Sequence, residues 1–369
     1  MDKPVKPLSK QLPPLILGGA GFSYQCHPDP ESLPVSKVII RAFDSGMTAI
    51  DTSPYYEPSE QLIGKALQDP EITRKYSRED YILMTKVGRI KSDIVDYSTD
   101  WVRQSVERSL TRFGTTYLDV VFCHDVEFVT EEDTLGAIGV LLNFVRDGKL
   151  RYIGISSYRI DILARLAQLT RQQFGRPLDI IQNWGQMNLQ NGRLEKDGLK
   201  KFEEAGVTCV LNASPLNIGL LRNGGVPIGK LGDFHPAPQG LRKRVQDVAD
   251  YIASRGENLA AVALRYALWR CQEMSHDLFR VCTITGISNI SDLTENVETA
   301  LKILKPREGS SRILSDVSLD LDQLRKDKPL FEEAQAIFGE WMEYGFTSPD
   351  PRWSIKLKRM MSNEAVENS

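Results

Sequence analysis

The sequence has few of the features that mark a secreted, membrane or nucleic-acid-binding protein. Its five cysteines are odd in number and show no C-x-x-C spacing, so we expect neither a disulfide framework nor a metal site. No apolar run approaches the ~18 residues that cross a bilayer. The sequence begins Met-Asp-Lys-Pro-Val-Lys-Pro, which lacks the apolar core of a secretion signal and predicts a cytoplasmic protein.

The sequence also has no large excess of positive or negative charge. Lys and Arg total 46 against 49 Asp and Glu, so the net charge is −3 and no basic surface for nucleic acid or an anionic membrane is expected. What is present is the composition of a globular enzyme, with 41% hydrophobic and 26% charged residues. A length of 369 residues allows two average domains or one α/β barrel.

Short apolar runs alternate along the chain with longer amphipathic segments. Most of the runs lack apolar/polar alternation, which is typical of parallel strands buried on both faces. The eight predicted strands cover residues 15–17, 48–51, 81–85, 118–123, 152–155, 180–182, 208–211 and 281–284. The predicted helices cover residues 36–45, 59–67, 99–113, 130–145, 160–173, 198–205, 241–255 and 258–270, with another beginning at Ser291.

Local signals support these helix ends. Thr130 precedes a first turn of acidic residues, which suits a helix N-terminus. Glycines follow several helices and suit the left-handed position after a helix end; they are Gly46, Gly114, Gly148, Gly175 and Gly206.

Eightfold strand–helix alternation predicts a single (β/α)8 TIM barrel over residues 1–304. The competing fold is a doubly wound open sheet, which usually carries G-x-G-x-x-G after its first strand. Residues 18–22 read Gly-Gly-Ala-Gly-Phe instead, and these glycines more simply let the backbone pass close to a ligand or a turn. Residues 217–240 predict a mobile loop, and residues 305–369 a partly helical C-terminal extension with a frayed tail after residue 359.

In such a barrel the active site lies at the carboxyl ends of the strands, and polar residues stand there. Asp51, Lys86 and His124 end the second, third and fourth predicted strands, and Tyr56 follows Asp51 by five residues. Each alone has an ordinary explanation, such as a turn, a solvent-facing cation or a core histidine. Together they predict proton transfer at a carbonyl or alcohol, without a metal, and a separate hydride carrier is then required.

In this hypothesis a cation lowers the pKa of a tyrosine so that it can act as acid and base. Lys86 is the cation, Asp51 holds it, and His124 orients the reacting oxygen.

At these residues the sequence resembles the aldo-keto reductases. The carrying motifs are Ala-Ile-Asp-Thr-Ser-Pro-Tyr-Tyr at residues 49–56, Thr85-Lys86, His124, Gly-Ile-Ser-Ser at 154–157, Gln182, Gly-Ile-Ser at 286–288 and Glu295-Asn296. The resemblance implies a catalytic tetrad of Asp51, Tyr56, Lys86 and His124. It also implies cofactor contacts from Ser156, Gln182, Ser214, Leu216, Gly286, Ser288, Glu295 and Asn296, and substrate contacts from Phe22, Tyr55 and His124. Tyr24 and Trp101 are further candidates for the pocket wall.

The sequence departs from the family pattern in three places. Ala213 stands where many relatives stack an aromatic on nicotinamide, Ser157 replaces a usual asparagine, and Glu57 replaces a frequent glycine. Residues 85–90, 123–129 and 212–221 are most like the sugar dehydrogenases of the family. Residues 285–293 contain no basic side chain for a 2′-phosphate, and Asp292 would repel one, so we expect NAD rather than NADP.

These features predict NAD-dependent oxidation of the anomeric hydroxyl of an aldose, D-arabinose or a similar sugar, to its lactone. The alternatives are an NADPH-dependent aldehyde or ketone reductase, a regulatory subunit that senses the cofactor without turnover, and a Schiff-base lyase that uses Lys86 as nucleophile. The expected partner is the small-molecule substrate alone, with the protein a monomer or a weak homo-oligomer.

Overall fold

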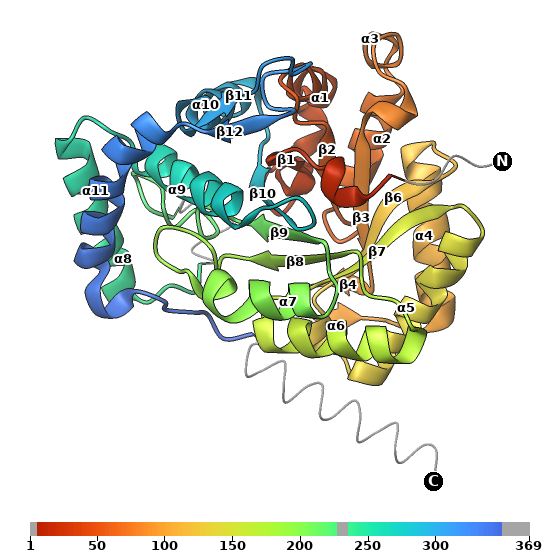
Figure 1. Cartoon of the computed structure of the whole chain (residues 1–369). Coiled ribbons are helices and arrows are strands. Elements are labelled where there is room, and N and C mark those ends of the chain that lie inside the picture. The colour runs from red at the N-terminus through yellow and green to blue at the C-terminus, as the bar shows by residue number, and fades with distance from the viewer. Residues whose placement is uncertain (1–5, 227–234, 349–369) are drawn as a thin grey trace.

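The computed structural model describes residues 6–226 and 235–348, and its centre is a closed barrel of parallel strands (Figure 1). The barrel strands are β1 (Leu15–Gly18), β2 (Ala49–Asp51), β3 (Ile82–Val87), β6 (Leu118–Cys123), β7 (Leu150–Ser156), β8 (Ile180–Trp184), β9 (Cys209–Ala213) and β10 (Arg280–Gly286). Their order around the barrel is β1, β10, β9, β8, β7, β6, β3 and β2, and β2 pairs again with β1. The predicted barrel is confirmed, and the open sheet was the wrong alternative.

Helices surround the barrel and cover its outer face (Figure 1). They are α1 (Val35–Asp44), α2 (Ser59–Leu67), α3 (Pro70–Thr73), α4 (Thr99–Phe113), α5 (Glu131–Arg146), α6 (Ile160–Phe174), α7 (Lys200–Glu204), α8 (Gln239–Ser254), α9 (Leu259–Met274), α10 (Ile290–Ile303) and α11 (Leu321–Phe338). The helix predicted over 198–205 differs, because a π-helical segment, η6 (Leu194–Leu199), occupies its first turn. Short 3-10 turns complete the chain: η1 (Leu8–Lys10), η2 (Gly19–Phe22), η3 (Pro30–Ser32), η4 (Arg78–Asp80), η5 (Val126–Phe128) and η7 (Gly339–Trp341).

The apolar side chains form two layers, one on each side of the barrel wall. The inner layer fills the barrel and includes Ile16, Met84 and Phe122, while the outer layer packs the strands against the helices. Leu8 and Leu12 belong to the inner layer, so the segment before β1 closes the amino-terminal end of the barrel. The opposite end, where the strands finish, is left for the polar residues.

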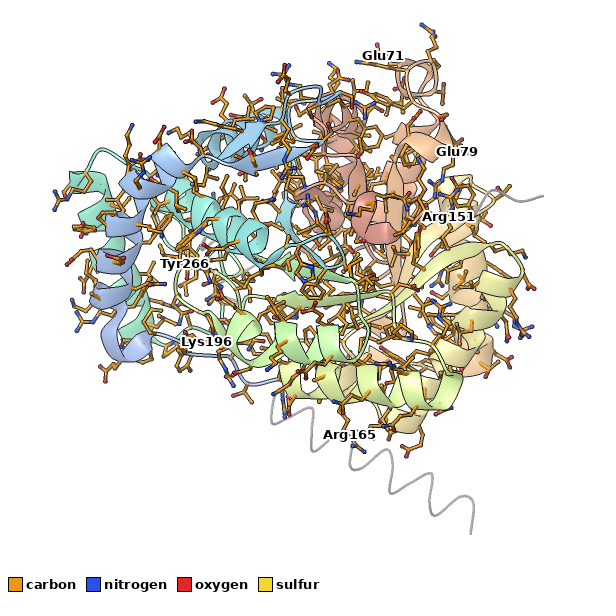
Figure 2. The ribbon with its side chains drawn as sticks, in the orientation of Figure 1. Glu71, Glu79, Arg151, Arg165, Lys196 and Tyr266 are labelled. Carbon is orange, nitrogen blue, oxygen red and sulfur yellow. The ribbon has the colours of Figure 1, made fainter. Side chains whose placement is uncertain are left out.

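The amino-terminal end is also tied by an ion-pair cluster. Asp119 on β6 accepts hydrogen bonds from the Arg78 and Arg151 guanidinium groups at 2.7 and 3.0 Å, and Arg151 extends outward from β7 (Figure 2). The carboxylate is fully buried and also accepts the backbone N–H of Leu83. This cluster joins β3, β6 and β7 at the end of the barrel away from the predicted site.

Most of the predicted helix signals hold. Thr130 and Asp133 form a reciprocal capping box at the start of α5. All five predicted glycines have positive φ, as expected after a helix end. The start predicted at Ser291 is wrong, because the side chain of Asn289 caps α10 by accepting the N–H of Asp292 at 2.8 Å.

The glycines of residues 18–22 lie against the end of β10. A Cβ on Gly18 would come within 2.9 Å of the Thr285 carbonyl oxygen, and one on Gly21 within 2.8 Å of that of Ile287. What passes close here is therefore another part of the backbone, namely the end of β10 and the turn that follows it.

Beyond α10 the chain forms the hairpin β11 (Leu304–Pro306) and β12 (Val317–Leu319), and then α11, which lies along α8 (Figure 1). A fully buried ion pair fixes α11, because Arg265 on α9 contacts Asp327 at 2.7 and 3.0 Å. The division at residue 304 stays a prediction.

Part of the predicted loop at residues 217–240, namely residues 227–234, lies outside the described residues, as does the predicted tail after residue 359. Within the part that the structure describes, no helix is long and apolar enough to span a bilayer.

Candidate active site

The four residues of the predicted tetrad lie at the carboxyl-terminal rim of the barrel. Asp51 is the last residue of β2, Lys86 the next to last of β3, and His124 directly follows β6. Tyr56 lies in the loop between β2 and α2. Because these three strands are adjacent and parallel, their ends meet on one side of the same rim.

Lys86 is buried and fully engaged by oxygen acceptors. Its Nζ donates to both Asp51 carboxylate oxygens at 2.8 Å and to the Thr52 carbonyl oxygen at 2.9 Å. The side chains of Lys86 and Asp51 are 1% and 5% exposed. With three donors on three acceptors, the ammonium is held in one position.

Tyr56 lies next to this ion pair and next to the histidine. The Lys86 Nζ is 5.4 Å from the centre of the Tyr56 ring, and the Tyr56 and His124 rings meet edge to face at 5.8 Å. The predicted tetrad is therefore brought together in space.

The pKa of Tyr56 is raised rather than lowered. Burial, followed by the Asp51 and Asp125 carboxylates, raises the pKa of Tyr56 well above its usual value, and Arg89 offsets only part of this. The predicted lowering of this pKa by Lys86 is therefore not observed, and the role of Tyr56 as acid and base stays a prediction. The physical reason is that burial disfavours the charged phenolate, and that the carboxylate of Asp51, which pairs with Lys86, adds negative charge nearby.

His124 is neutral and its tautomer is fixed by a neighbour. Burial, with Lys86 and Arg89 adding to it, lowers the pKa of His124 to about 3, although Asp125 opposes the change. Ser53 Oγ accepts the Tyr55 N–H and lies 3.1 Å from His124 Nδ1. The other ring nitrogen, Nε2, lies 3.5 Å from the Asp125 carboxylate, which can only accept a hydrogen bond. This placement favours the tautomer with the proton on Nε2, where it is also available to a substrate oxygen.

The loop that carries Tyr56 is anchored through α2. Glu60 is almost fully buried, and its carboxylate accepts from Thr85 and Ser109 at 2.7 Å and from Arg112 at 3.0 Å. Since Thr85 precedes Lys86, this carboxylate fixes the start of α2 relative to the lysine strand.

Gln182 and Ser156 fit the amide of a nicotinamide. Gln182 lies on β8 with its Nε2 3.3 Å from Asp51, while its Oε1 is buried and has no hydrogen-bond partner among the described residues. A buried acceptor without a donor is costly, and the NH2 of a carboxamide would satisfy it. Ser156 Oγ accepts the Asp125 N–H at 3.3 Å, so its hydroxyl proton remains available to a carboxamide oxygen.

The other predicted cofactor residues follow β9 and β10 on the same rim. Ser214 and Leu216 are half-buried in the turn after β9, where Ser214 has a φ of 57°. The remaining four are Gly286 at the end of β10, Ser288 in the turn that follows it, and Glu295 and Asn296 on α10. Asn296 donates to Thr285 Oγ1 at 3.4 Å, and Glu295 is exposed. Their cofactor roles stay predictions.

The predicted substrate residues separate into two groups. Tyr55 is half-buried, with its ring 5.9 Å from that of His124, so both line the mouth of the site. Phe22 was a wrong choice, because its side chain is fully buried in the outer core layer and has no surface for a ligand. Tyr24 is largely exposed and bonds to Glu31, and Trp101 lies on α4 beneath Arg108.

Sequence reasoning missed three polar residues at this rim, namely Ser53, Arg89 and Asp125. Asp125 and Arg89 pair with each other beside His124. Each follows a tetrad strand within three residues, so the strand-end argument that selected Lys86 and His124 could have selected them too.

No group of three or more His, Cys, Asp or Glu side chains in the described ranges could hold a metal ion. A hollow of about 360 Å³ opens between α9 and α11, lined by Lys196 and Tyr266 among others (Figure 2). It contains none of the tetrad residues, and its Arg270 already pairs with Glu195.

Comparison with known proteins agrees with this geometry. Residues 14–313 match the Aldo/keto reductase family. The chain is 40% identical over 282 residues to D-arabinose 1-dehydrogenase of Saccharomyces cerevisiae, covering 76% of this chain and 80% of the relative. It is 32% identical over 287 residues to L-galactose dehydrogenase of Arabidopsis thaliana (77% and 83%), and 27% identical over 319 residues to L-glyceraldehyde 3-phosphate reductase of Escherichia coli O157:H7 (79% and 86%).

Proposed function

Because this chain belongs to the aldo/keto reductase family, we propose that it oxidises the anomeric hydroxyl of an aldose, D-arabinose or a similar sugar, to the lactone with NAD. The observation that carries the proposal is the position of Tyr56 between the Asp51–Lys86 pair and His124, at the rim that also holds Gln182. The relatives named above as sugar dehydrogenases support the substrate class.

In the proposed reaction the sugar loses a hydride from C1 and a proton from the C1 hydroxyl. Bound NAD supplies the hydride acceptor and a positive charge. His124 donates its Nε2 proton as a hydrogen bond to the C1 oxygen and orients it. Tyr56 takes the hydroxyl proton as hydride leaves C1, and the C1–O bond becomes the carbonyl of the lactone. To accept this proton the Tyr56 phenol must itself be deprotonated, although burial and the Asp51 and Asp125 carboxylates raise its pKa.

Two side-chain arrangements favour this reaction over the alternatives. Lys86 uses its three donors on Asp51 and Thr52, so its nitrogen is held in the ion pair and is not positioned to attack a carbonyl as a Schiff-base nucleophile. Asp292 sits in the first turn of α10, and its carboxylate accepts from Asn289 at 2.9 Å. A fixed carboxylate there would repel a 2′-phosphate, which supports NAD over NADP. We further propose a cytoplasmic protein, monomeric or weakly self-associating.

The test is to follow NADH formation by absorbance with a panel of aldoses, and then to repeat it with NADP. We expect turnover with NAD and much lower efficiency with NADP. Tyr56→Phe should abolish turnover while NAD affinity, measured by quenching of protein fluorescence, stays nearly unchanged. Full activity of Tyr56→Phe would refute the role of the phenol. Consumption of NADPH with aldehydes but no sugar oxidation would favour the reductase, and cofactor binding with no turnover would favour the sensor.

A further inference from the structure

A second charged pair bridges the two strands that carry Lys86 and His124. The strands β3 and β6 are neighbours, and Val87 pairs with Cys123 at their ends. Gly88, with a φ of +99°, then turns the chain so that Arg89 faces the residue after His124. There the Arg89 guanidinium bonds to the Asp125 carboxylate.

Neighbouring groups hold both members of the Arg89–Asp125 pair in place. The Arg89 guanidinium lies 4.5 Å from the centre of the Tyr55 ring and 5.1 Å from that of Phe128. Asp125 has a left-handed φ of 55°, and its N–H donates to Ser156 Oγ at 3.3 Å. The two side chains are 18% and 7% exposed. A carboxylate fixed in this way loses little entropy when it binds a ligand.

The carboxylate adjoins the nitrogen that reaches the reacting oxygen. His124 Nδ1 is taken by Ser53, and the other ring nitrogen, Nε2, lies 3.5 Å from Asp125 Oδ2. Burial raises the pKa of Asp125, but the positive charges of Arg89 and Lys86 and the hydrogen bond from Arg89 lower it, and the pKa lies below its usual value. Asp125 is therefore an anionic acceptor at neutral pH, and its carboxylate lies 3.5 Å from the histidine nitrogen that would bind the reacting oxygen.

We propose that Asp125, held by Arg89, accepts a hydrogen bond from the hydroxyl on the carbon next to the reacting one, and so selects substrates that carry a vicinal hydroxyl. This rests on the proposed function and deepens it. In an aldose the neighbour of the C1 hydroxyl is the C2 hydroxyl, so an oxygen bound by His124 Nε2 brings the C2 oxygen to the adjacent carboxylate. A 2-deoxy sugar cannot donate this hydrogen bond to the charged carboxylate, which penalises it relative to the full sugar.

The experiment combines removal of the C2 hydroxyl from the substrate with removal of the Asp125 carboxylate from the protein. The kcat/KM with NAD is measured for D-arabinose and for 2-deoxy-D-ribose, which is D-arabinose without its C2 hydroxyl. We expect the wild type to prefer D-arabinose by about 10- to 100-fold, the range for a hydrogen bond to a charged group. In Asp125→Ala this ratio should fall to within about threefold of unity, and in the near-isosteric Asp125→Asn to an intermediate value.

Asp161→Asn is the matched control, because Asp161 also pairs with an arginine, Arg159, but its side chain is 64% exposed. Its ratio should equal that of the wild type. If Asp125→Ala lowers kcat/KM equally for both sugars, the proposal is overturned, since Asp125 would then only orient His124. A wild-type ratio near unity would overturn it without any variant.

Failure of the sugar oxidation itself is a separate result. If the wild type oxidises no aldose, the same ratio is measured in reduction with NADPH, comparing glyceraldehyde with 3-hydroxypropanal, which lacks the hydroxyl next to the carbonyl. A preference for glyceraldehyde that disappears in Asp125→Ala then supports the role of Asp125 while the proposed oxidation falls. Equal efficiency with the two aldehydes overturns the selection by Asp125.

Discussion

Lys86→Met should destabilise the protein strongly as well as inactivate it. The Lys86 and Asp51 side chains are 1% and 5% exposed, and two 2.8 Å contacts join them. Removing the lysine leaves a buried carboxylate whose one remaining side-chain hydrogen bond among the described residues is the weak 3.3 Å contact from Gln182. Breaking one side of a buried pair typically costs about 3–5 kcal/mol in the free energy of unfolding.

The double variant Asp51→Asn/Lys86→Met separates stability from catalysis. It removes both buried charges, so the free energy of unfolding should return to within about 2 kcal/mol of the wild type. Activity should not return, because the ammonium beside Tyr56 is still absent. The ion pair would then be present for the chemistry of the site rather than for the stability of the fold.

The assay is urea unfolding followed by circular dichroism, with NADH formation measured on the same samples. Lys10→Met is the control, since Lys10 pairs with the 98% exposed Asp277 and should leave the unfolding curve nearly unchanged. The reasoning is refuted if Lys86→Met unfolds like this control, or if the double variant regains sugar oxidation.

Three further outcomes are expected. Because the pKa of Tyr56 is raised and the phenol must be deprotonated to accept a proton, kcat/KM for oxidation should rise with pH into the alkaline range, and a flat profile would argue against this base. Burial and then Asp125 raise the pKa of Glu127 from 4.5 to about 7, so its contribution to wild-type stability is complete below pH 4.5 and is lost as the pH rises through 7. Glu127→Gln should remove that loss, up to about 3 kcal/mol, and parallel urea midpoints for both proteins across this range would contradict it. Gly64→Ala should destabilise by about 1–3 kcal/mol or more, because a Cβ there would lie 1.9 Å from the Arg112 carbonyl oxygen on α4; an unchanged unfolding midpoint would mean that α2 and α4 can separate freely.

The sequence alone determined the barrel and the rim on which the tetrad stands. Strands buried on both faces, helix caps such as Thr130 and the glycines after helices are local signals, so they can be read without knowing the fold. The location of the tetrad residues at one rim then followed from the parallel order, because every strand of such a barrel ends at the same rim. The errors at helix ends were small and local, as at Asn289, where two neighbouring residues could each have capped α10.

Only the tertiary structure decided the electrostatics of the site and which side chains reach it. Phe22 and Tyr55 look alike in the sequence, yet one is buried in the outer core and the other faces His124. The raised pKa of Tyr56 depends on burial and on Asp51 and Asp125, charges whose positions are set by strand pairing. Burial and Coulomb interactions act through space between residues far apart in the chain, so no local pattern of residues can encode their balance.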